Sequence, residues 1–102
     1  MEEGKEDDAK KGIDEATKTI IEYPTVYPFK VMGLQEHGFS EYVRLLFSRV
    51  LGTEVSRDSV SVQPSSRNKY VSITVSVYLI SEDQRRRLYE TLHKERRVLY
   101  YL

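Results

Sequence analysis

Apolar and polar residues alternate strictly between Tyr70 and Ile80, which makes this segment the clearest strand in the sequence. Valine, isoleucine or leucine occupies every second position from 71 to 79, and tyrosine, serine or threonine stands between them. This period of two is typical of a strand with one face buried and the other at least partly wet. Shorter runs predict strands at 29–33, 59–63 and 96–102. Pro28 should stand at the start of the first, because proline cannot donate to a sheet.

Two segments have the three-and-four spacing of apolar residues that marks one face of a helix. The first runs from Phe39 to Leu51, with Ser40 as the expected N-cap and Gly52 as the expected stop. The second begins at Ser81, which forms a capping-box pattern with the glutamine three positions later. Its expected core contacts are Leu88 and Leu92.

The elements follow one another as strand, helix, strand, strand, helix, strand, which predicts an α+β fold. The favoured arrangement is a two-layer ferredoxin-like βαββαβ sandwich, with an antiparallel sheet in the order 4-1-3-2 and both helices on one face. The long third strand then lies inside the sheet, and the second and fourth strands form its edges. The sheet residues expected beneath the helices are Phe29, Val31, Val60, Val62, Val71, Ile73, Val75, Val77, Val98 and Tyr100.

Charge divides the chain at about residue 22. The formal net charge of the whole chain is zero, but residues 1–22 hold eight acids and four lysines. Residues 1–12 contain no branched or aromatic apolar side chain, so we expect a disordered acidic tail there. Residues 13–22 could add one or two marginal helical turns. Residues 23–102 are then a single ferredoxin-like domain.

Composition excludes several classes of protein. The chain has no cysteine, which rules out disulfides, cysteine-ligated metals and a thiol nucleophile. No apolar run approaches the ~18 residues that a membrane helix needs. The beginning of the sequence lacks the features of a secretory signal, so we expect a cytoplasmic protein with no membrane contact.

Four segments of the sequence resemble signatures of the YbeD-like family, small bacterial proteins that are carried as a domain of unknown function. The segments are 23–25 with 29–33, 64–66 with 70–74, 88–92 and 98–102. The resemblance implies a ferredoxin-like fold, similar to the ACT-type regulatory domains that bind small ligands beside metabolic enzymes. It implies no known reaction and no known site residues. The acidic tail departs from the family pattern, and so does Arg85, which stands where an apolar helix residue is expected.

Two polar loops are candidates for binding a small ligand. The first leads into the N-terminus of the first helix, where free N–H groups favour anions, and ACT-type domains hold their ligands near this loop. The second is a polar turn with hydroxyls and cations, whose simpler interpretation is a hairpin turn. The candidate residues in these loops are Gly33, Leu34, Gln35, Gly38, Ser65, Ser66 and Lys69.

The wet face of the sheet is the candidate interaction surface. It should carry tyrosines beside one lysine, which suits a protein partner or a second copy of the chain. The candidate interface residues are Lys30, Met32, Tyr70, Ser72, Tyr78 and Tyr101. A sheet face of this kind also suits single-stranded RNA, but the glycine-aromatic motif of RNA-recognition modules is absent. Nucleic acid is therefore the alternative to protein.

The residues give little support for catalysis. The carboxylates of residues 23–102 fall in predicted helices or loops, and the two histidines, His37 and His93, have no further ligands at metal-binding spacing. We therefore expect no catalytic residues, no metal and no cofactor. The basic residues at 85–87, 94, 96 and 97 are interpreted as a solvated face, with a phosphate-binding surface as the alternative. The sequence favours a non-enzymatic regulatory or interaction module.

Overall fold

The computed structural model describes residues 11–14, 18–36, 38–65 and 67–102. Along the chain, the first strands are β1 (Lys11–Asp14), β2 (Thr19–Glu22) and β3 (Thr25–Leu34). Helix α2 (Phe39–Leu51) and a short 3₁₀ turn, η1 (Arg57–Ser59), lead to β4 (Val60–Pro64) and β5 (Tyr70–Leu79). Helix α3 (Glu82–Lys94) and β6 (Tyr100–Tyr101) complete the described elements.

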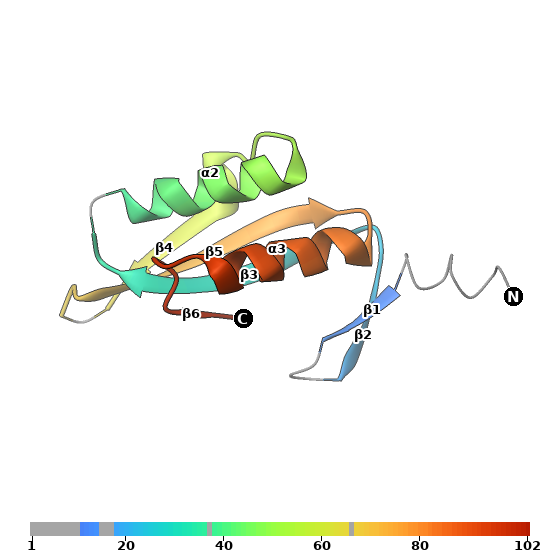
Figure 1. The fold of residues 1–102 in the computed structure, drawn as a ribbon, viewed down its shortest axis with the longest axis horizontal. Coiled ribbons are helices and arrows are strands. Elements are labelled where there is room, and N and C mark those ends of the chain that lie inside the picture. The colour runs from blue at the N-terminus through green and yellow to red at the C-terminus, as the bar shows by residue number, and fades with distance from the viewer. Residues whose placement is uncertain (1–10, 15–17, 37, 66) are drawn as a thin grey trace, which may run out of the picture.

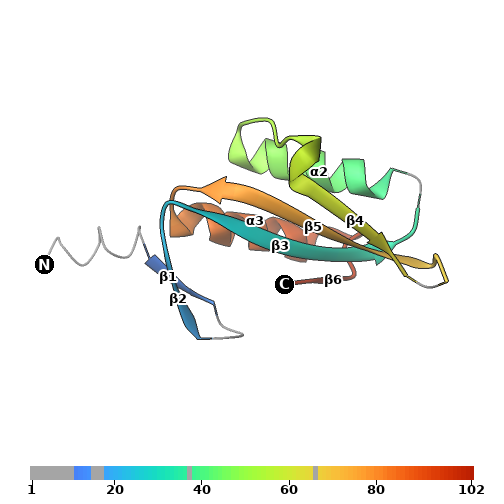
Figure 2. The ribbon, with the colours of Figure 1, turned by 180° about the vertical axis from the view of Figure 1, so that it is seen from behind.

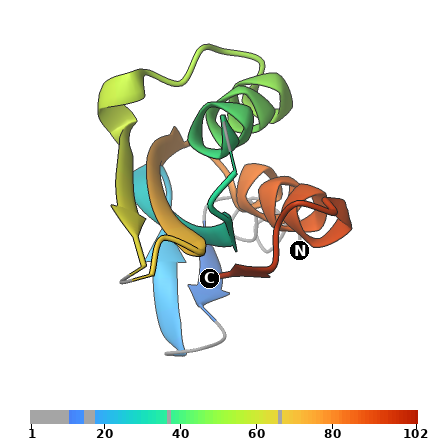
Figure 3. The same ribbon diagram turned by 90° about the vertical axis from the view of Figure 1, so that its left-hand side faces the viewer.

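Strands β3 to β6 form an antiparallel sheet in the order β4-β5-β3-β6. Numbered by their places in the expected βαββαβ unit, these strands read 4-1-3-2 from the β6 edge. Both helices cover one face of the sheet, and the other face is left open (Figures 1 and 3). This arrangement confirms the predicted α+β, ferredoxin-like fold. The fold could be predicted because apolar faces of helices and strands must be buried against one another.

The core lies between the sheet and the two helices. Phe29 of β3 is fully buried, and its ring meets the ring of Phe47 from α2 at a centroid distance of 5.2 Å. Leu88 and Leu92 of α3 are buried as predicted. Every second residue of β5 from Val71 to Leu79 is also buried, in agreement with the period of two. Val62 was expected in this layer but is exposed, because β4 is an edge strand that the helices do not fully cover.

Strand β3 begins earlier than the proline pattern suggested. Pro28 lies inside β3 opposite Ser76, not at its start. The N–H of Lys30 bonds to Leu102 on the β6 side, so by the two-residue period the nitrogen of Pro28 also faces that side. Strand β6 pairs with Val31 and Met32 only, so no strand lies opposite Pro28 there. The missing donor therefore leaves no sheet hydrogen bond unmade.

The last strand has the opposite register to the one expected. Tyr101 pairs with Val31 and faces the helices, whereas Tyr100 pairs with Met32 and is exposed on the open side. The prediction that Tyr101 lies on the open face and Tyr100 in the core is wrong for both residues. A one-residue change of register moves every side chain of a strand to the other face. Here Val98 lies in the turn after α3, where its N–H bonds to Glu95, so it does not fix the alternation of the strand.

The helical turns expected within residues 13–22 do not occur at the described positions 13, 14 and 18–22. Instead, β1 and β2 pair as a separate two-stranded antiparallel hairpin that projects from the end of the main sheet (Figure 2). Ile13 lies opposite Ile20, and Gly12 lies opposite Ile21, which packs against the core. Branched side chains favour strands, so local propensity agrees with the hairpin. The disordered tail predicted for residues 1–12 falls mostly outside the described residues.

Glycine residues stand at both ends of α2, and a serine caps the start of α3. Helix α2 is preceded by Gly38, not by the predicted cap Ser40, and Gly38 has a φ of 79°, which glycine adopts without strain. Gly52 ends the helix with a φ of 72°, as predicted. At the start of α3, the Ser81 side chain accepts a hydrogen bond from the N–H of Gln84, which confirms that cap. The Gln84 side chain accepts from the N–H of Ile80 in return.

Candidate functional site

The face of the sheet opposite the helices is the candidate functional site, and we call it the open face. Cross-strand pairs place Lys30 opposite Thr74 and Met32 opposite Ser72 on this face. The remaining apolar and aromatic members come from three strands. They are Val26, Leu34, Tyr70, Tyr78 and Tyr100. The structure thus brings five of the six predicted interface residues together and excludes Tyr101.

Several large side chains on the open face are exposed. Val26 and Tyr78 are paired across β3 and β5, and they are 63% and 62% exposed. Met32 touches a hollow of about 330 Å³ that is also lined by Tyr70, Gln63 and Pro64. The open face therefore carries exposed apolar side chains among serine, threonine and lysine, is partly concave, and is covered by no described element. Exposed large apolar side chains gathered on one face are typical of interaction sites.

The open face is almost free of charge. The sequences of β3, β4, β5 and β6 contain no acidic residue, and their single charged residue is Lys30. A second cation lies at the rim, where the ammonium of Lys69 stands 5.4 Å from the centre of the Tyr70 ring. The surface therefore combines aromatic and aliphatic groups with a small positive charge, and its strands supply no acidic side chain.

The free edge of β4 offers few backbone groups for pairing. The N–H of Ser65 bonds to the carbonyl of Tyr70, so Pro64, one position earlier, faces away from β5 and has no N–H to offer. Val60 faces the same way, but its N–H bonds to the carbonyl of Arg57. The other edge of the sheet carries Pro28 in the same role. Proline at the edges is a common protection against strand addition.

The structure separates the residues of the anion site predicted before α2, and that site stays a prediction. Gly33 packs closely against its surroundings: a Cβ there would lie 2.4 Å from the ring of Phe39 and 2.8 Å from the Arg97 carbonyl. Leu34 belongs to the open face. Gln35 and Gly38 line a hollow of about 330 Å³ beside α2, but Glu36 lines it too and would repel an anion.

The polar turn between β4 and β5 serves the hairpin itself. The Ser65 hydroxyl oxygen accepts hydrogen bonds from the N–H groups of Lys69 and Tyr70, each 3.2 Å long. These bonds support the simpler interpretation of this turn. Ser66 and His37 lie outside the described residues. His93 lies at the end of α3, and its Nδ1 is 3.1 Å from the hydroxyl of Tyr101.

The sequence did not predict a buried ionic cluster at the start of α3. Glu82 is 4% exposed and Arg85 is 8% exposed, and two hydrogen bonds of 2.9 Å join them. The Tyr23 hydroxyl donates to Glu82 at 2.5 Å. The guanidinium of Arg85 also lies 5.6 Å from the ring centre of Tyr27 and 5.5 Å from that of Tyr89. Arg85 occupies the same helix face as Leu88 and could have been recognised by that spacing.

The cluster shifts the pKa of its members in directions that favour the ion pair. Burial raises the pKa of Glu82, but hydrogen bonds from Arg85 and Tyr23 outweigh it, and the net pKa is lowered. The carboxylate holds the pKa of Arg85 above its usual range despite burial. Burial, and then the nearby Glu82, raise the pKa of Tyr23. The pKa of Tyr89 is raised mainly by burial and then by its hydrogen bond with Tyr27. The carboxylate is therefore held in its charged form, which does not suit a general acid.

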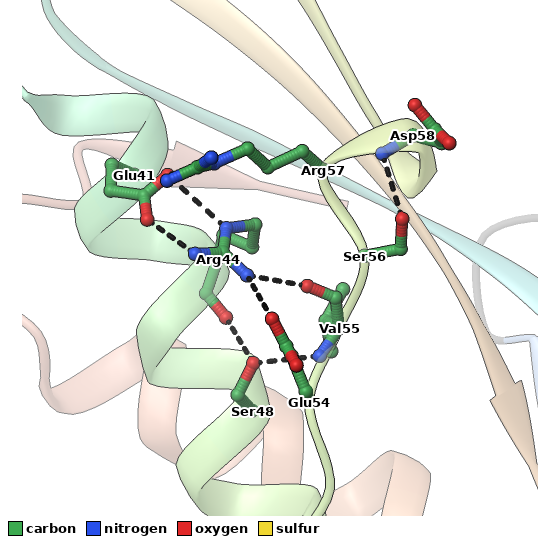
Figure 4. Close-up of polar contacts among 8 residues, drawn as sticks. All are labelled: Glu41, Arg44, Ser48, Glu54, Val55, Ser56, Arg57 and Asp58. Atoms are coloured by element: carbon green, nitrogen blue, oxygen red, sulfur yellow. Dashed lines mark hydrogen bonds and ion pairs between the residues drawn. The ribbon is translucent and has the colours of Figure 1, made fainter.

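A second buried arginine lies on α2 (Figure 4). The guanidinium of Arg44 contacts the Glu41 carboxylate and donates to the carbonyl of Val55 at 2.6 Å. The Ser48 hydroxyl donates to the Arg44 carbonyl and accepts from the N–H of Val55. These bonds fix the loop after α2 against the helix. The hydrogen bonds from Arg44 lower the pKa of Glu41 to about 2.

The predicted basic face is divided among separate contacts. Arg85 and Arg86 bind Glu82, and Arg87 binds Asp83. Arg97 stacks over Phe39 and Tyr42, at 5.3 Å and 4.6 Å from the ring centres. These residues therefore do not form one phosphate-binding surface. No group of three potential metal-ligating side chains occurs among the described residues. The helices described here are also too short and polar to cross a membrane.

Comparison with known proteins places this fold in a family. A profile of a protein family of unknown function, DUF493, matches residues 18–102. The chain belongs to the DUF493 family. This agrees with the resemblance to YbeD-like proteins, which form the same family under the name UPF0250.

Curated DUF493 relatives carry the name UPF0250 protein and no stated activity. The protein from Leptothrix cholodnii is 36% identical over 75 residues, which is 74% of this chain and 81% of the relative. The protein from Janthinobacterium is 34% identical over 88 residues, covering 84% of this chain and 93% of the relative. These matches show bacterial relatives of similar length.

The solution structure of HP0495 from H. pylori has the same fold. It aligns with a TM-score of 0.64 at 17% sequence identity and covers 86% of this chain and 91% of that chain. The DUF493 profile includes β2 and all later elements, whereas β1 lies outside the match. The completed hairpin is thus an addition to the part that the family profile describes.

Proposed function

We propose that this DUF493 protein is a non-enzymatic, cytoplasmic interaction module that binds a protein partner through the open face of its sheet. The observation that carries the proposal is the exposed apolar and aromatic surface formed by Val26, Met32, Tyr78 and their neighbours on strands without acidic residues. Burial of such surface is the main favourable term in protein association.

The charge of the open face indicates the chemistry of the partner. Lys30 lies in the middle of the face and Lys69 at its rim, and no strand of the sheet supplies a carboxylate to meet them. Two open faces pressed together would bring lysines, but no acids, into contact. A different protein with apolar side chains around an acidic group complements the surface better. The ACT-like regulatory role implied by the family resemblance is compatible with such a partner.

Docking on the face is favoured over addition of a strand at an edge. The β4 edge presents Pro64, and the uncovered part of β3 presents Pro28, so each edge is missing a donor that an added strand would use. Side-chain contacts on the face need no such donors. The proposal therefore places recognition in side chains rather than in the backbone.

Single-stranded RNA is the second candidate for the same surface. Tyr70, with Lys69 beside its ring, and Tyr78 could stack bases. The arginines at 85–87, which the RNA hypothesis also used, are instead paired with Glu82 and Asp83. RNA binding would weaken with added salt and would be lost in Tyr70→Ala. Absence of binding at low salt would remove this candidate.

The test uses matched substitutions on and away from the open face. Tyr78→Ser and Met32→Ser change the proposed surface, and Leu45→Ser changes an apolar residue that is 50% exposed on α2. Surface substitutions of this kind change stability by about 0.5 kcal/mol or less, so all three variants should fold. Affinity capture from cell extract should recover the same proteins with the wild type and L45S. Tyr78→Ser and Met32→Ser should each lose them.

Light scattering of the purified protein tests whether a second copy of the chain occupies the open face instead. We expect a monomer at micromolar concentration, because the face lacks the acids needed to complement its own lysines. A dimer that Tyr78→Ser converts to monomer would instead make the second copy the occupant. If capture is unchanged by every open-face variant and the protein is monomeric, the open face is not a docking surface.

A further inference from the structure

A second hollow lies away from the open face, between the β1–β2 hairpin and the start of α3. Its volume is about 660 Å³, which falls in the range typical of small-molecule sites. The hairpin side of the hollow is formed by Lys11, Gly12, Ile13 and Ile20. The helix side is formed by Glu82, Arg85 and Arg86.

The wall of this hollow is fixed by contacts between the hairpin and the buried cluster. Arg85 donates to the carbonyl of Ile13 at 3.0 Å. Gly12 lies so close to the helix that a Cβ there would be 1.9 Å from a carboxylate oxygen of Glu82. The hairpin therefore rests on groups that are themselves held by two hydrogen bonds within α3 and one from Tyr23. A preformed wall binds a ligand without an ordering cost.

The hollow has an excess of positive charge. Lys11, Arg85 and Arg86 line it with three cations, against two carboxylates, that of Glu82 in the lining and that of Glu22, which lies opposite Lys11 across the hairpin. The Arg86 side chain is 75% exposed at the rim, and its Nε donates to Glu82 at 3.2 Å. That bond orients the guanidinium, and most of the side chain remains in solvent. Guanidinium groups recognise carboxylates and phosphates through paired hydrogen bonds.

An apolar pair borders the same space. Ile13 and Ile20 lie opposite each other in the hairpin, and both side chains are exposed although they line the hollow. Half-exposed isoleucines gain from contact with an apolar group, because each exposed Å² that is covered contributes roughly 25 cal/mol. The lining therefore matches a molecule with an apolar body and an anionic group.

We propose that the hollow between the hairpin and α3 binds a small amphipathic anion, with its carboxylate, sulfonate or phosphate group at Lys11 and Arg86 and its apolar body against Ile13 and Ile20. The site is independent of the open face. It needs β1, which lies outside the region that the DUF493 profile matches. Part of the site therefore lies outside the region that the family profile describes.

The probe for this site is 1-anilinonaphthalene-8-sulfonate, which combines aromatic rings with one sulfonate. Its fluorescence is titrated with the full-length wild type, with a Lys11→Gln and Arg86→Gln double variant, and with a Lys30→Gln and Lys69→Gln control. The control removes the same charge from the open face. The hairpin variant should weaken binding by at least about fivefold, because two charge-assisted contacts are lost. The control should bind as the wild type does.

Nuclear magnetic resonance locates the bound probe. The amides of Gly12, Ile13 and Arg86 should shift on addition of the probe, whereas the amide of Tyr78 should not. Equal affinity in the wild type and the hairpin variant, or shifts confined to the open face, would overturn the proposal. The proposed function would stand in either case, because it concerns a different surface.

Displacement of the probe separates the possible anionic groups. 1-Naphthoate and 1-naphthyl phosphate share one ring system, so the better competitor shows whether a carboxylate or a phosphate is preferred. Competition by either supports the site. The neutral 1-naphthol serves as the matched control, and equal competition by it would show that no anion is recognised.

Discussion

Helices α2 and α3 each carry a glutamate three residues before a buried arginine, but the two pairs lie in different surroundings. On α2 the Arg44 side chain is 7% exposed and its partner Glu41 is 40% exposed. On α3 the Arg85 side chain is 10% exposed and Glu82 only 6%. The first carboxylate remains in water, whereas the second has been removed from it and is surrounded by Tyr23, Arg85 and Arg86.

The two pairs therefore have different roles: the pair on α2 holds a loop, and the pair on α3 is a buried ion pair. Arg44 holds the loop after α2 through the Val55 carbonyl, and Glu41 can be solvated if the arginine is lost. Glu82 is not accessible to water in this way, so its negative charge is stabilised only by the groups that surround it. A buried pair adds little net stability, but breaking it leaves a charge without compensation. The same sequence pattern therefore has different consequences on the two helices.

The largest expected effect follows from Arg85→Met. The substitution keeps the side-chain volume but leaves Glu82 buried without its main partner, which should cost about 3–5 kcal/mol of unfolding free energy. Urea denaturation measures this loss. A Glu82→Leu and Arg85→Met double variant should recover most of it, because both charges are gone. A double variant as unstable as Arg85→Met alone would contradict the ionic explanation.

The second largest effect is expected at alkaline pH, where the cluster at the start of α3 should lose stability. The pKa of Tyr23 and that of Tyr89 are both raised, chiefly by burial. A group with a raised pKa contributes its stability in full below its unfolded value of about 10, and the contribution is lost as the pH rises above it. The urea midpoint should therefore fall above pH 10. Tyr89→Phe should flatten that fall, and the exposed-site control Tyr78→Phe should leave it unchanged.

Arg44→Met should cause a clearly smaller loss than Arg85→Met. The variant loses the hydrogen bond to the Val55 carbonyl, but Glu41 stays in water. Urea denaturation of both arginine variants under the same conditions compares their losses of unfolding free energy directly. Equal losses at the two positions would show that solvent access to the carboxylate does not decide the cost.

The smallest effect is expected at acid pH from Glu41. Hydrogen bonds from Arg44 lower its pKa to about 2, so its contribution is present above the unfolded value of about 4.3 and is lost as the pH falls through 2. Glu41→Gln should flatten the stability profile in that window. High salt should weaken the effect, because the carboxylate is exposed. A salt-independent effect would indicate a buried carboxylate instead.

The sequence predicted the fold and the open face because both depend on periodicity. Ten residues of strict alternation in β5 show which side of the strand is buried. The faces of β3 match those of β5, because the two strands pair along their whole length. Strand β6 has two residues, too few for a pattern to fix its register, so Tyr100 and Tyr101 were assigned to the wrong faces. The hairpin was missed because Ile13 and Ile20 are too few to distinguish a strand from a helical turn.

The buried cluster could not be predicted from charge alone. A glutamate and an arginine three residues apart usually form a solvated pair on a helix surface. The spacing of Arg85 from Leu88 and Leu92 shows that it shares their face, but only the structure shows that Glu82 and the Ile13 carbonyl accept its hydrogen bonds there. The hollow beside it depends on a hairpin that packs from a distant part of the chain.

Site-specific photo-cross-linking in cells tests the central claim most directly. A photoreactive phenylalanine analogue is placed at position 78 on the open face or at position 45 on the exposed side of α2. The account predicts discrete covalent adducts with a partner protein from position 78 and none of them from position 45. Adducts that are identical from both positions, or absent from position 78, would contradict the role of the open face in docking.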